Sequence, residues 1–324
     1  MIRLSQMDNK LELDPKSRIY IAGHRGLVGS ALWRYFKSAG FSNLVGYTSA
    51  EVDLRKEDQT SRAIASAKPQ VLIIAAAKVG GIMANSTYPV EFLNENLKIQ
   101  TNLFEAALAN DVSKVLFLGS SCIYPKFAPQ PISEKSLLTG ALEQTNDAYA
   151  IAKIAGVMQV EAYRREYKRS WISAMPTNLY GSEDNFDLQT SHVLPALIRK
   201  FHEAKVSRES VVTLWGSGEP MREFLHTDDL ARAILHLLEN YDDGAPINIG
   251  WGKDISIADL AALIAEIVGY EGSIEWDDSK PDGTPRKLLD TSKINSLGWH
   301  PEIGLREGIE STYKWYLGNQ LKRN

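Results

Sequence analysis

Two hydroxyls and the chain's only cysteine follow directly after a short apolar run. Residues 114–118 form that run, Gly119 ends it, and Ser120, Ser121 and Cys122 come next. In an open parallel sheet, ligands bind outside the carboxyl ends of the strands, and a thiol can exchange protons near neutral pH. We interpret this stretch as one wall of an active site; the alternative is a polar turn with a buried, inert thiol.

A tyrosine and a lysine four residues apart form a second candidate for proton chemistry. Tyr149 and Lys153 share one face of a predicted helix, and Asn146 directly before it is a typical capping residue. A neighbouring ammonium favours the phenolate and makes the phenol a better proton donor. Taken alone, the pair also fits a surface tyrosine beside a solvated lysine.

The elements that position these groups begin with a strand at 18–22, a glycine-rich turn at 23–29 and a helix that continues to Ser38. Glycines at 23, 26 and 29 allow a tight turn, a close approach of the backbone to a pyrophosphate and close helix packing. The N-terminus of the helix then faces the phosphates. The sequence therefore predicts a dinucleotide site, against the alternative of a plain strand–helix turn.

Strands and helices alternate over the first half of the chain. Further strands are indicated by apolar runs at 44–48, 71–77, 114–118 and 172–181, and helices by the periodicity of 57–67 and 91–110. Continuous apolar runs are typical of strands buried on both faces. Later the alternation weakens: strands are predicted at 212–216 and 222–226, around a glycine turn, and at 247–250, with helices at 228–240 and 257–268.

This pattern predicts an α/β fold, a Rossmann-type doubly wound parallel sheet with a smaller, interleaved α/β substrate domain. A chain of 324 residues is long enough for two such parts. We expect an N-terminal extension at 1–16, a dinucleotide-binding domain formed by 17–178 and about 221–250, and a substrate-binding domain formed by about 179–220 and 251–324.

Composition argues against several classes of partner. The net charge is −4, so no basic field favours nucleic acid or an anionic membrane, and no apolar run approaches membrane-spanning length. A single cysteine excludes an intramolecular disulfide framework, and the N-terminal residues contain no secretory apolar region. We therefore expect a cytoplasmic protein that binds neither nucleic acid nor membrane, and we predict no metal site.

Taken together, these motifs resemble the extended short-chain dehydrogenase/reductase family. That family pairs an N-terminal Gly-x-x-Gly-x-x-Gly with a catalytic Tyr-x-x-x-Lys and an upstream serine, which here is Ser120. A narrower group, the epimerase–reductases of GDP-4-keto-6-deoxy-D-mannose, is similar in further segments at 75–82, 119–125, 175–181, 191–193 and 222–226. The resemblance covers nearly the whole chain.

The resemblance implies 3,5-epimerisation and 4-reduction of that keto-sugar. Cys122 and His192 match the pair that exchanges protons at C3 and C5, although an isolated histidine is more often structural. Tyr149 would protonate the C4 oxygen during hydride transfer, and Ser120 would hydrogen-bond that oxygen. Lys153 would lower the pKa of the tyrosine and hold the nicotinamide ribose.

The resemblance also implies NADP(H) as the cofactor, a GDP-linked 4-keto-6-deoxy sugar as the substrate and a homodimer as the assembly. The cofactor-binding residues would be Gly23, Arg25, Gly26, Leu27, Val28, Gly29, Asp53, Leu54, Ala75, Ala76, Ala77, Tyr149, Lys153, Pro176, Asn178, Leu179 and His192. The substrate-binding residues would be Ser120, Ser121, Cys122, Asn178, Val193, Leu197, Lys200, Trp215 and Arg222, with Arg222 as a clamp for the diphosphate.

One position departs from the family pattern. Members often carry an arginine after the second strand, where it grips the 2′-phosphate of NADP, whereas this chain has Thr48 and Ser49. Arg25 in the glycine turn remains as a cation, and no acidic residue stands at 48–49 to repel a phosphate. We therefore predict that NADPH is preferred over NADH, but less strictly.

Three other functions stay open from the sequence. The sister reaction on GDP-4-keto-3,6-dideoxymannose, which gives GDP-L-colitose, would use the same side chains and invert only C5. Another nucleotide-sugar epimerase or dehydratase is disfavoured by the contexts of Cys122 and His192. A non-catalytic dinucleotide-binding regulator would tend to lose the tyrosine or the lysine, and this chain has both.

Overall fold

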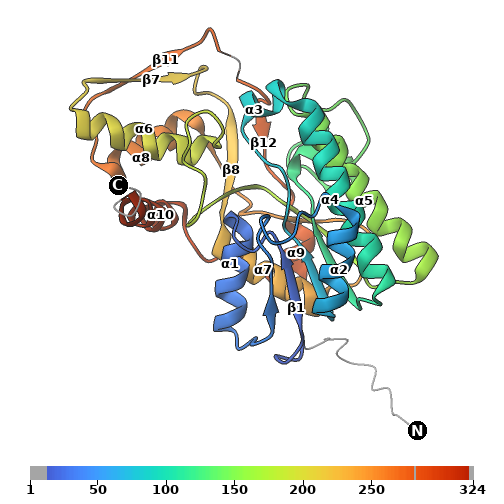
Figure 1. The fold of residues 1–324 in the computed structure, drawn as a ribbon. Helices are drawn as coiled ribbons and strands as arrows, with labels where there is room; N and C mark the ends of the chain where they lie inside the picture. The colour runs from blue at the N-terminus through green and yellow to red at the C-terminus, as the bar shows by residue number, and fades with distance from the viewer. Residues whose placement is uncertain (1–12, 281, 321–324) are drawn as a thin grey trace.

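The computed structural model describes residues 13–280 and 282–320, so most of the predicted N-terminal extension lies outside the described residues. Six parallel strands form the central sheet in the order β2-β1-β3-β4-β5-β9 (Figure 1). Their bounds are β1 Ile19–Ala22, β2 Leu44–Val45, β3 Val71–Ile74, β4 Lys114–Leu118, β5 Ile172–Pro176 and β9 Ile247–Ile249. The strand order reverses between β1 and β3, where doubly wound sheets bind their ligands. The predicted Rossmann-type sheet is confirmed.

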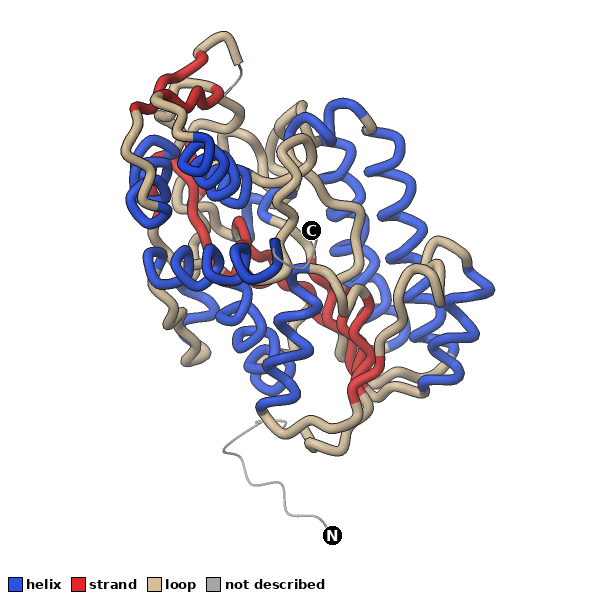
Figure 2. Tube along the Cα trace, turned by 60° about the vertical axis from the view of Figure 1, so that its left-hand side comes forward, coloured by secondary structure: helices blue, strands red, loops and turns tan. Residues whose placement is uncertain are grey.

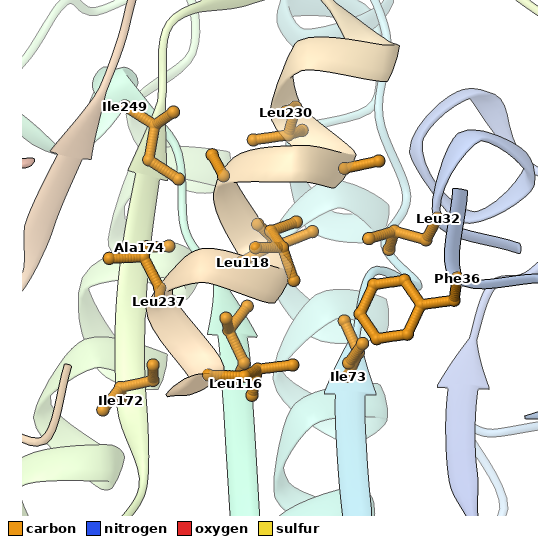
Figure 3. Packing of buried hydrophobic residues seen from close by; sticks show 14 of the residues in the cluster. Leu32, Phe36, Ile73, Leu116, Leu118, Ile172, Ala174, Leu230, Leu237 and Ile249 are labelled. Carbon is orange, nitrogen blue, oxygen red and sulfur yellow. The ribbon is translucent and has the colours of Figure 1, made fainter. Parts of the chain in front are cut away.

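Helices cover both faces of the sheet because its strands are apolar on both sides. Alternate residues of β1, β3 and β4 belong to two separate hydrophobic clusters. One cluster includes α1 (Leu27–Ser38) and α7 (Thr227–Asn240); the other includes α2 (Glu57–Ala67), α4 (Pro89–Ala109) and α5 (Asp147–Tyr167). Figure 3 shows the first layer, with side chains of α1 and α7 packed onto β3, β4 and β5.

A second, smaller group of elements encloses its own hydrophobic cluster. It contains β6 (Asn178–Tyr180), α6 (Val193–Ser207), β7 (Val211–Trp215), β8 (Met221–His226), β10 (Asp254–Ser256), α8 (Ile257–Val268), β11 (Ser273–Asp277), β12 (Arg286–Lys287) and α10 (Leu305–Gln320). Strand β8 pairs with β6, β10 and β12, and it leads directly into α7 of the first group. In Figure 2 the β7–β11 pair lies well away from the central sheet.

The two groups are interleaved along the chain. Ile294 of α9 (Ser292–Ser296) and Trp299 lie late in the sequence, yet both pack in the hydrophobic cluster with α1 and α7. The chain also passes from the second group to the first where β8 leads into α7. The domain boundaries predicted from the sequence remain a proposal.

Four predicted strands differ from the structure. The run at 172–181 forms two strands, β5 in the central sheet and β6, which pairs with β8. The segment at 212–216 pairs with β11 instead of adjoining β8 around a glycine turn, because its partner comes from a distant part of the chain. β2 ends at Val45 and β3 at Ile74, since the glycine turn packs against the residues that follow them. A Cβ at Gly46 would lie 2.5 Å from the His24 ring. None of the helices in the described part of the chain is long and apolar enough to cross a membrane.

Candidate active site

The turn predicted as a site wall follows β4, and Ser120 fixes its backbone. Ser120 precedes one helical turn, Ser121–Ile123, and its hydroxyl accepts a hydrogen bond from the Cys122 backbone N–H at 3.3 Å. Gly119 before it lies close to β5: a Cβ there would lie 2.4 Å from the sulfur of Met175, whose side chain would have to shift. The Ser121 side chain is buried, whereas Ser120 and Cys122 remain partly open.

Tyr149 and Lys153 lie on α5 beside this turn. The Tyr149 phenol is hydrogen-bonded to the Ser120 hydroxyl, and the Lys153 Nζ lies 5.9 Å from the Tyr149 ring centre. The same ammonium donates to the Leu118 carbonyl oxygen at 2.7 Å and lies 4.8 Å from the Phe117 ring centre. The end of β4 thus holds the lysine, and the serine after it holds the tyrosine.

Burial dominates the electrostatics of this pair. It raises the pKa of Tyr149, Cys122 raises it further, and the Ser120 hydrogen bond offsets only part of that rise. Burial also lowers the pKa of Lys153 to about 7. The structure therefore differs from the expectation that the lysine lowers the tyrosine pKa, because an ammonium destabilised by burial is only partly charged near neutral pH.

The Cys122 sulfur faces two hydrogen-bond donors. Asn146 Nδ2 lies 3.4 Å from Sγ, and Lys287 Nζ of β12 lies 3.6 Å from it. His192 stands directly before α6 and is exposed to solvent. Crowding by the protein lowers the pKa of His192, and the Lys287 charge lowers it further. Lys287 therefore acts electrostatically on both residues predicted for epimerisation.

Asn146 and Lys287 are not among the predicted site residues. Asn146 was expected only to cap α5, but its side chain makes no capping bond and contacts Cys122 instead. Only its place three residues before Tyr149 in the sequence indicates that it belongs to the site. Lys287 lies in a stretch without a motif, and the pairing of β12 with β8 places it opposite Arg222.

Basic side chains gather at the predicted substrate side. Arg222 donates to the Met221 carbonyl oxygen at 2.9 Å and interacts electrostatically with Cys122. The Nζ atoms of Lys200 and Lys280 lie 5.6 and 5.9 Å from the Trp215 ring centre. Trp215 is 54% exposed, so its ring is available to a ligand.

Some predicted contacts are occupied by the protein itself. Leu197 of α6 is only 4% exposed and packs in the third hydrophobic cluster, whereas Val193 at the start of the same helix is 37% exposed. The Asn178 amide donates to the Glu223 carbonyl oxygen at 2.8 Å. Leu197 and Asn178 therefore hold elements of the site in place.

The glycine turn after β1 has the close contacts that a phosphate-binding turn requires. Gly23 has a φ of +83°, and a Cβ there would lie 2.8 Å from the Ala76 backbone. A Cβ on Gly29 would lie 2.1 Å from the Gly23 carbonyl oxygen. Gly26 precedes α1 without a side-chain cap, so this helix N-terminus can receive an anion. The residues present fit a dinucleotide at the β1–β3 switch point.

The remaining predicted cofactor residues follow the strands on either side of this turn. Leu27 and Val28 begin α1, Ala75–Ala77 follow β3, and Pro176 ends β5 just before Leu179 in β6. Leu54 lies between β2 and α2, and its carbonyl accepts from the Asn102 side chain. The Asp53 carboxylate, next to it, pairs with Arg55 at 2.8 Å. These positions surround the crevice that the topology defines.

An acidic residue does lie near the glycine turn. Glu51 folds back so that its carboxylate accepts from the Thr48 backbone N–H at 2.7 Å, and it interacts electrostatically with Arg25 and His24. Thr48 and Ser49 themselves are uncharged. Arg25 therefore shares its charge with a carboxylate, which agrees with a less strict preference for a 2′-phosphate.

Comparison with known proteins identifies the class. Residues 19–250 match the model of the NAD dependent epimerase/dehydratase family, a range that includes the central sheet, the glycine turn and the segments of Cys122, Tyr149 and His192. The chain therefore belongs to the NAD dependent epimerase/dehydratase family.

Its relatives narrow this further. A probable GDP-L-fucose synthase of Oryza sativa subsp. japonica is 55% identical over 95% of this chain and 94% of its own, and the GDP-L-fucose synthase of Escherichia coli K12 is 51% identical over 94% and 98%. A solved GDP-L-fucose synthetase from Naegleria fowleri bound to NADP is 28% identical, with a TM-score of 0.89 over 97% and 98%. A GDP-L-colitose synthase of Yersinia pseudotuberculosis is more distant, at 38% identity over 94% and 99%. The chain groups with the GDP-L-fucose synthases and is an epimerase/reductase whose cofactor is NADP(H).

Proposed function

We propose that this enzyme converts GDP-4-keto-6-deoxy-D-mannose into GDP-L-fucose with NADPH. One observation carries the proposal: the Ser120 hydroxyl contacts both the Cys122 backbone N–H and the Tyr149 phenol. A base for epimerisation and an acid for reduction thus share one site, on either side of the group that would bind the C4 oxygen.

Epimerisation uses protons that the C4 ketone makes acidic. Cys122, as the thiolate, takes a proton from C3 or C5, and the electrons of that C–H bond move toward the C4 oxygen. Ser120 hydrogen-bonds this oxygen, and His192 returns a proton to the opposite face of the ring. The thiol then returns its proton to solvent and the imidazole takes one up, and the same sequence at the second carbon completes the inversion at both centres.

Reduction uses the other side of the turn. When bound, NADPH supplies a hydride to C4. Tyr149 gives its proton to the C4 oxygen, and the raised pKa of the buried phenol keeps that proton in place beforehand. Lys153 is fixed on the Leu118 carbonyl oxygen and would hold the ribose beside the nicotinamide.

The charged half of the substrate meets local cations. Lys200 and Lys280 lie beside Trp215, and Arg222 interacts electrostatically with Cys122, in a protein whose net charge is −4. Arginine suits phosphate oxygens because its guanidinium forms paired hydrogen bonds. We assign the GDP moiety to this side, and with it the division of the chain into cofactor-binding and substrate-binding parts.

Two alternatives receive less support. A GDP-L-colitose synthase would use the same catalytic groups, but the named fucose synthases are 51–55% identical to this chain and the colitose enzyme 38%. A non-catalytic regulator would not need Tyr149 and Lys153 in hydrogen-bonded positions beside a thiol. We also propose that the enzyme works as a homodimer.

The test separates the two half-reactions in D₂O. Cys122→Ser should lose deuterium incorporation at C3 and C5 by orders of magnitude, because a hydroxyl is a far weaker acid and base than a thiol. Tyr149→Phe should retain incorporation but lose NADPH oxidation by about 100-fold or more. Mass spectrometry of recovered substrate and the absorbance of NADPH measure the two steps.

The proposal fails if Tyr149→Phe blocks deuterium entry as completely as Cys122→Ser while both proteins still bind the GDP-sugar. Turnover of the 3-deoxy keto-sugar in preference to the 6-deoxy keto-sugar would instead assign the colitose reaction.

A further inference from the structure

Cys122 lies in a positively charged environment that the Cys/His pair does not explain. Lys287 Nζ and Asn146 Nδ2 both point donors at Sγ, at 3.6 and 3.4 Å. Arg222, on the neighbouring strand, also interacts electrostatically with the sulfur. Two donors at a sulfur suit its deprotonated form, because a thiolate accepts hydrogen bonds and has none to give.

Lys287 is held in this position by its strand. β12 pairs with β8, which places Lys287 beside Arg222. The next backbone N–H, of Leu288, donates to the Gln130 side chain at 2.9 Å. The Leu289 N–H donates at 3.1 Å to the carboxylate of Glu223, which is completely buried. The two residues after the lysine are therefore hydrogen-bonded to two separate parts of the chain, and the pairing with β8 fixes the lysine itself.

No carboxylate lies within ion-pair distance of Lys287 Nζ among residues 13–280 and 282–320. The Lys287 side chain is only partly exposed, and a partly buried ammonium gains from a nearby negative charge. The deprotonated Cys122 sulfur is the group placed to supply that charge.

We propose that Lys287 is a third catalytic residue of the epimerisation, the counter-charge of Cys122 whenever the sulfur lacks its proton. This role rests on the proposed function. Lys287 gives up no proton in this step. The Cys122 sulfur takes the proton from C3 or C5, the C–H electrons move toward the C4 oxygen, and the thiol that forms is neutral. Removing the cation should therefore slow proton abstraction and leave hydride transfer comparatively intact.

The same charge reaches His192. It lowers the pKa of that imidazole in addition to the effect of burial. Loss of the charge in Lys287→Met should therefore move the His192 titration to higher pH. A purely structural role for Lys287 would not predict this sign.

The test exploits the single cysteine, whose alkylation reports on one atom. Iodoacetamide modification of the NADP-bound enzyme is followed by mass spectrometry from pH 6 to pH 9, in the wild type, Lys287→Met, Lys287→Gln and Lys287→Arg. At neutral pH the Met and Gln variants should react at least about tenfold more slowly than the wild type. The reason is that an opposite charge within about 4–6 Å shifts an ionisation by about one to three pH units. Lys287→Arg should restore most of the rate.

Lys253→Met is the matched control, because that lysine is exposed and lies outside the site. Bound NADP and the unfolding temperature establish that each variant is folded. If Lys287→Met does not fold, Lys287→Gln takes its place in the comparison. Wild-type alkylation rates across the pH range in a folded Met or Gln variant would overturn the proposal. This assay needs no sugar substrate, so its outcome is independent of whether the GDP-fucose assignment holds. A second measurement, deuterium entry into the keto-sugar, then tests whether the charge acts in the reaction. We expect it to fall at least tenfold in Lys287→Met and to stay unchanged in Lys253→Met.

Discussion

Lys153 destabilises the folded protein by itself, because burial disfavours its ammonium. Its pKa is about 7 in the fold, against 10.5 for an ordinary lysine. For a base with a lowered pKa, the energetic penalty is fully present below about pH 7 and disappears as pH rises toward 10.5. The hydrogen bond to the Leu118 carbonyl offsets part of it.

We therefore expect Lys153→Met to be more stable than the wild type at pH 7, by up to several kcal/mol, and to lose reductase activity. The stability difference should shrink as pH rises to 10, as measured by urea unfolding at each pH. Lys98→Met, an exposed change on α4, should show no such pH dependence. A Lys153→Met protein that is less stable at pH 7, with a constant difference up to pH 10, would contradict the burial account.

At the residue scale, the sequence predicts the site residues that belong to a recognisable motif. It does not predict those that reach the site only because two distant strands pair. Ser120, Cys122 and Tyr149 lie within 30 residues of one another in recognisable contexts, and the structure places their side chains together. Lys287 is 165 positions from Cys122 and reaches it only through β12 and β8. Periodicity and motif spacing carry no information about that contact.

The glycine turn sets the position of the whole of α1 against β1 and β3. Gly29 lies inside the first turn of α1, where a Cβ would come within 2.1 Å of the Gly23 carbonyl oxygen. That atom belongs to the backbone, so it cannot move without displacing the turn. Gly29→Ala should therefore weaken NADPH binding by at least about tenfold, because a displacement of the turn misaligns the phosphate-binding N–H groups.

Gly318→Ala is the matched control for this change. Gly318 is also inside a helix, α10, but a Cβ there meets nothing within 4 Å. Alanine is the better helix former, so this variant should be as stable as the wild type or more so. NADPH fluorescence titration measures both. Equal affinities in Gly29→Ala and the wild type would show that the turn tolerates a methyl group there.

At the element scale, helices with a clear period are predicted closely and strand partners are not. The helix expected at 57–67 is α2, and the one expected at 257–268 is α8. The strand at 211–215 is present, but its partner β11 lies some sixty residues further along the chain. A helix satisfies its hydrogen bonds locally, whereas a strand depends on a segment that the local sequence does not specify.

At the scale of the whole molecule, α4 and α5 lie side by side on the outside of the sheet (Figure 1), and several of their apolar side chains are exposed. Ile151 and Met158 of α5 are 47% and 40% exposed, and their seven-residue spacing places them on one side of the helix. Val90 at the start of α4 is 67% exposed. A two-fold axis would bring the α5 side chains of two chains together, and this self-complementary arrangement suits the proposed homodimer.

Met158→Glu should therefore break the dimer, because two like charges would face each other in an apolar contact. Light scattering after gel filtration should give a mass near 36.0 kDa for this variant and twice that for the wild type. Val206→Glu, at a more exposed apolar position on α6, controls for added charge and should remain dimeric. A Met158→Glu protein that stays dimeric, or a Val206→Glu protein that dissociates, would place the interface elsewhere.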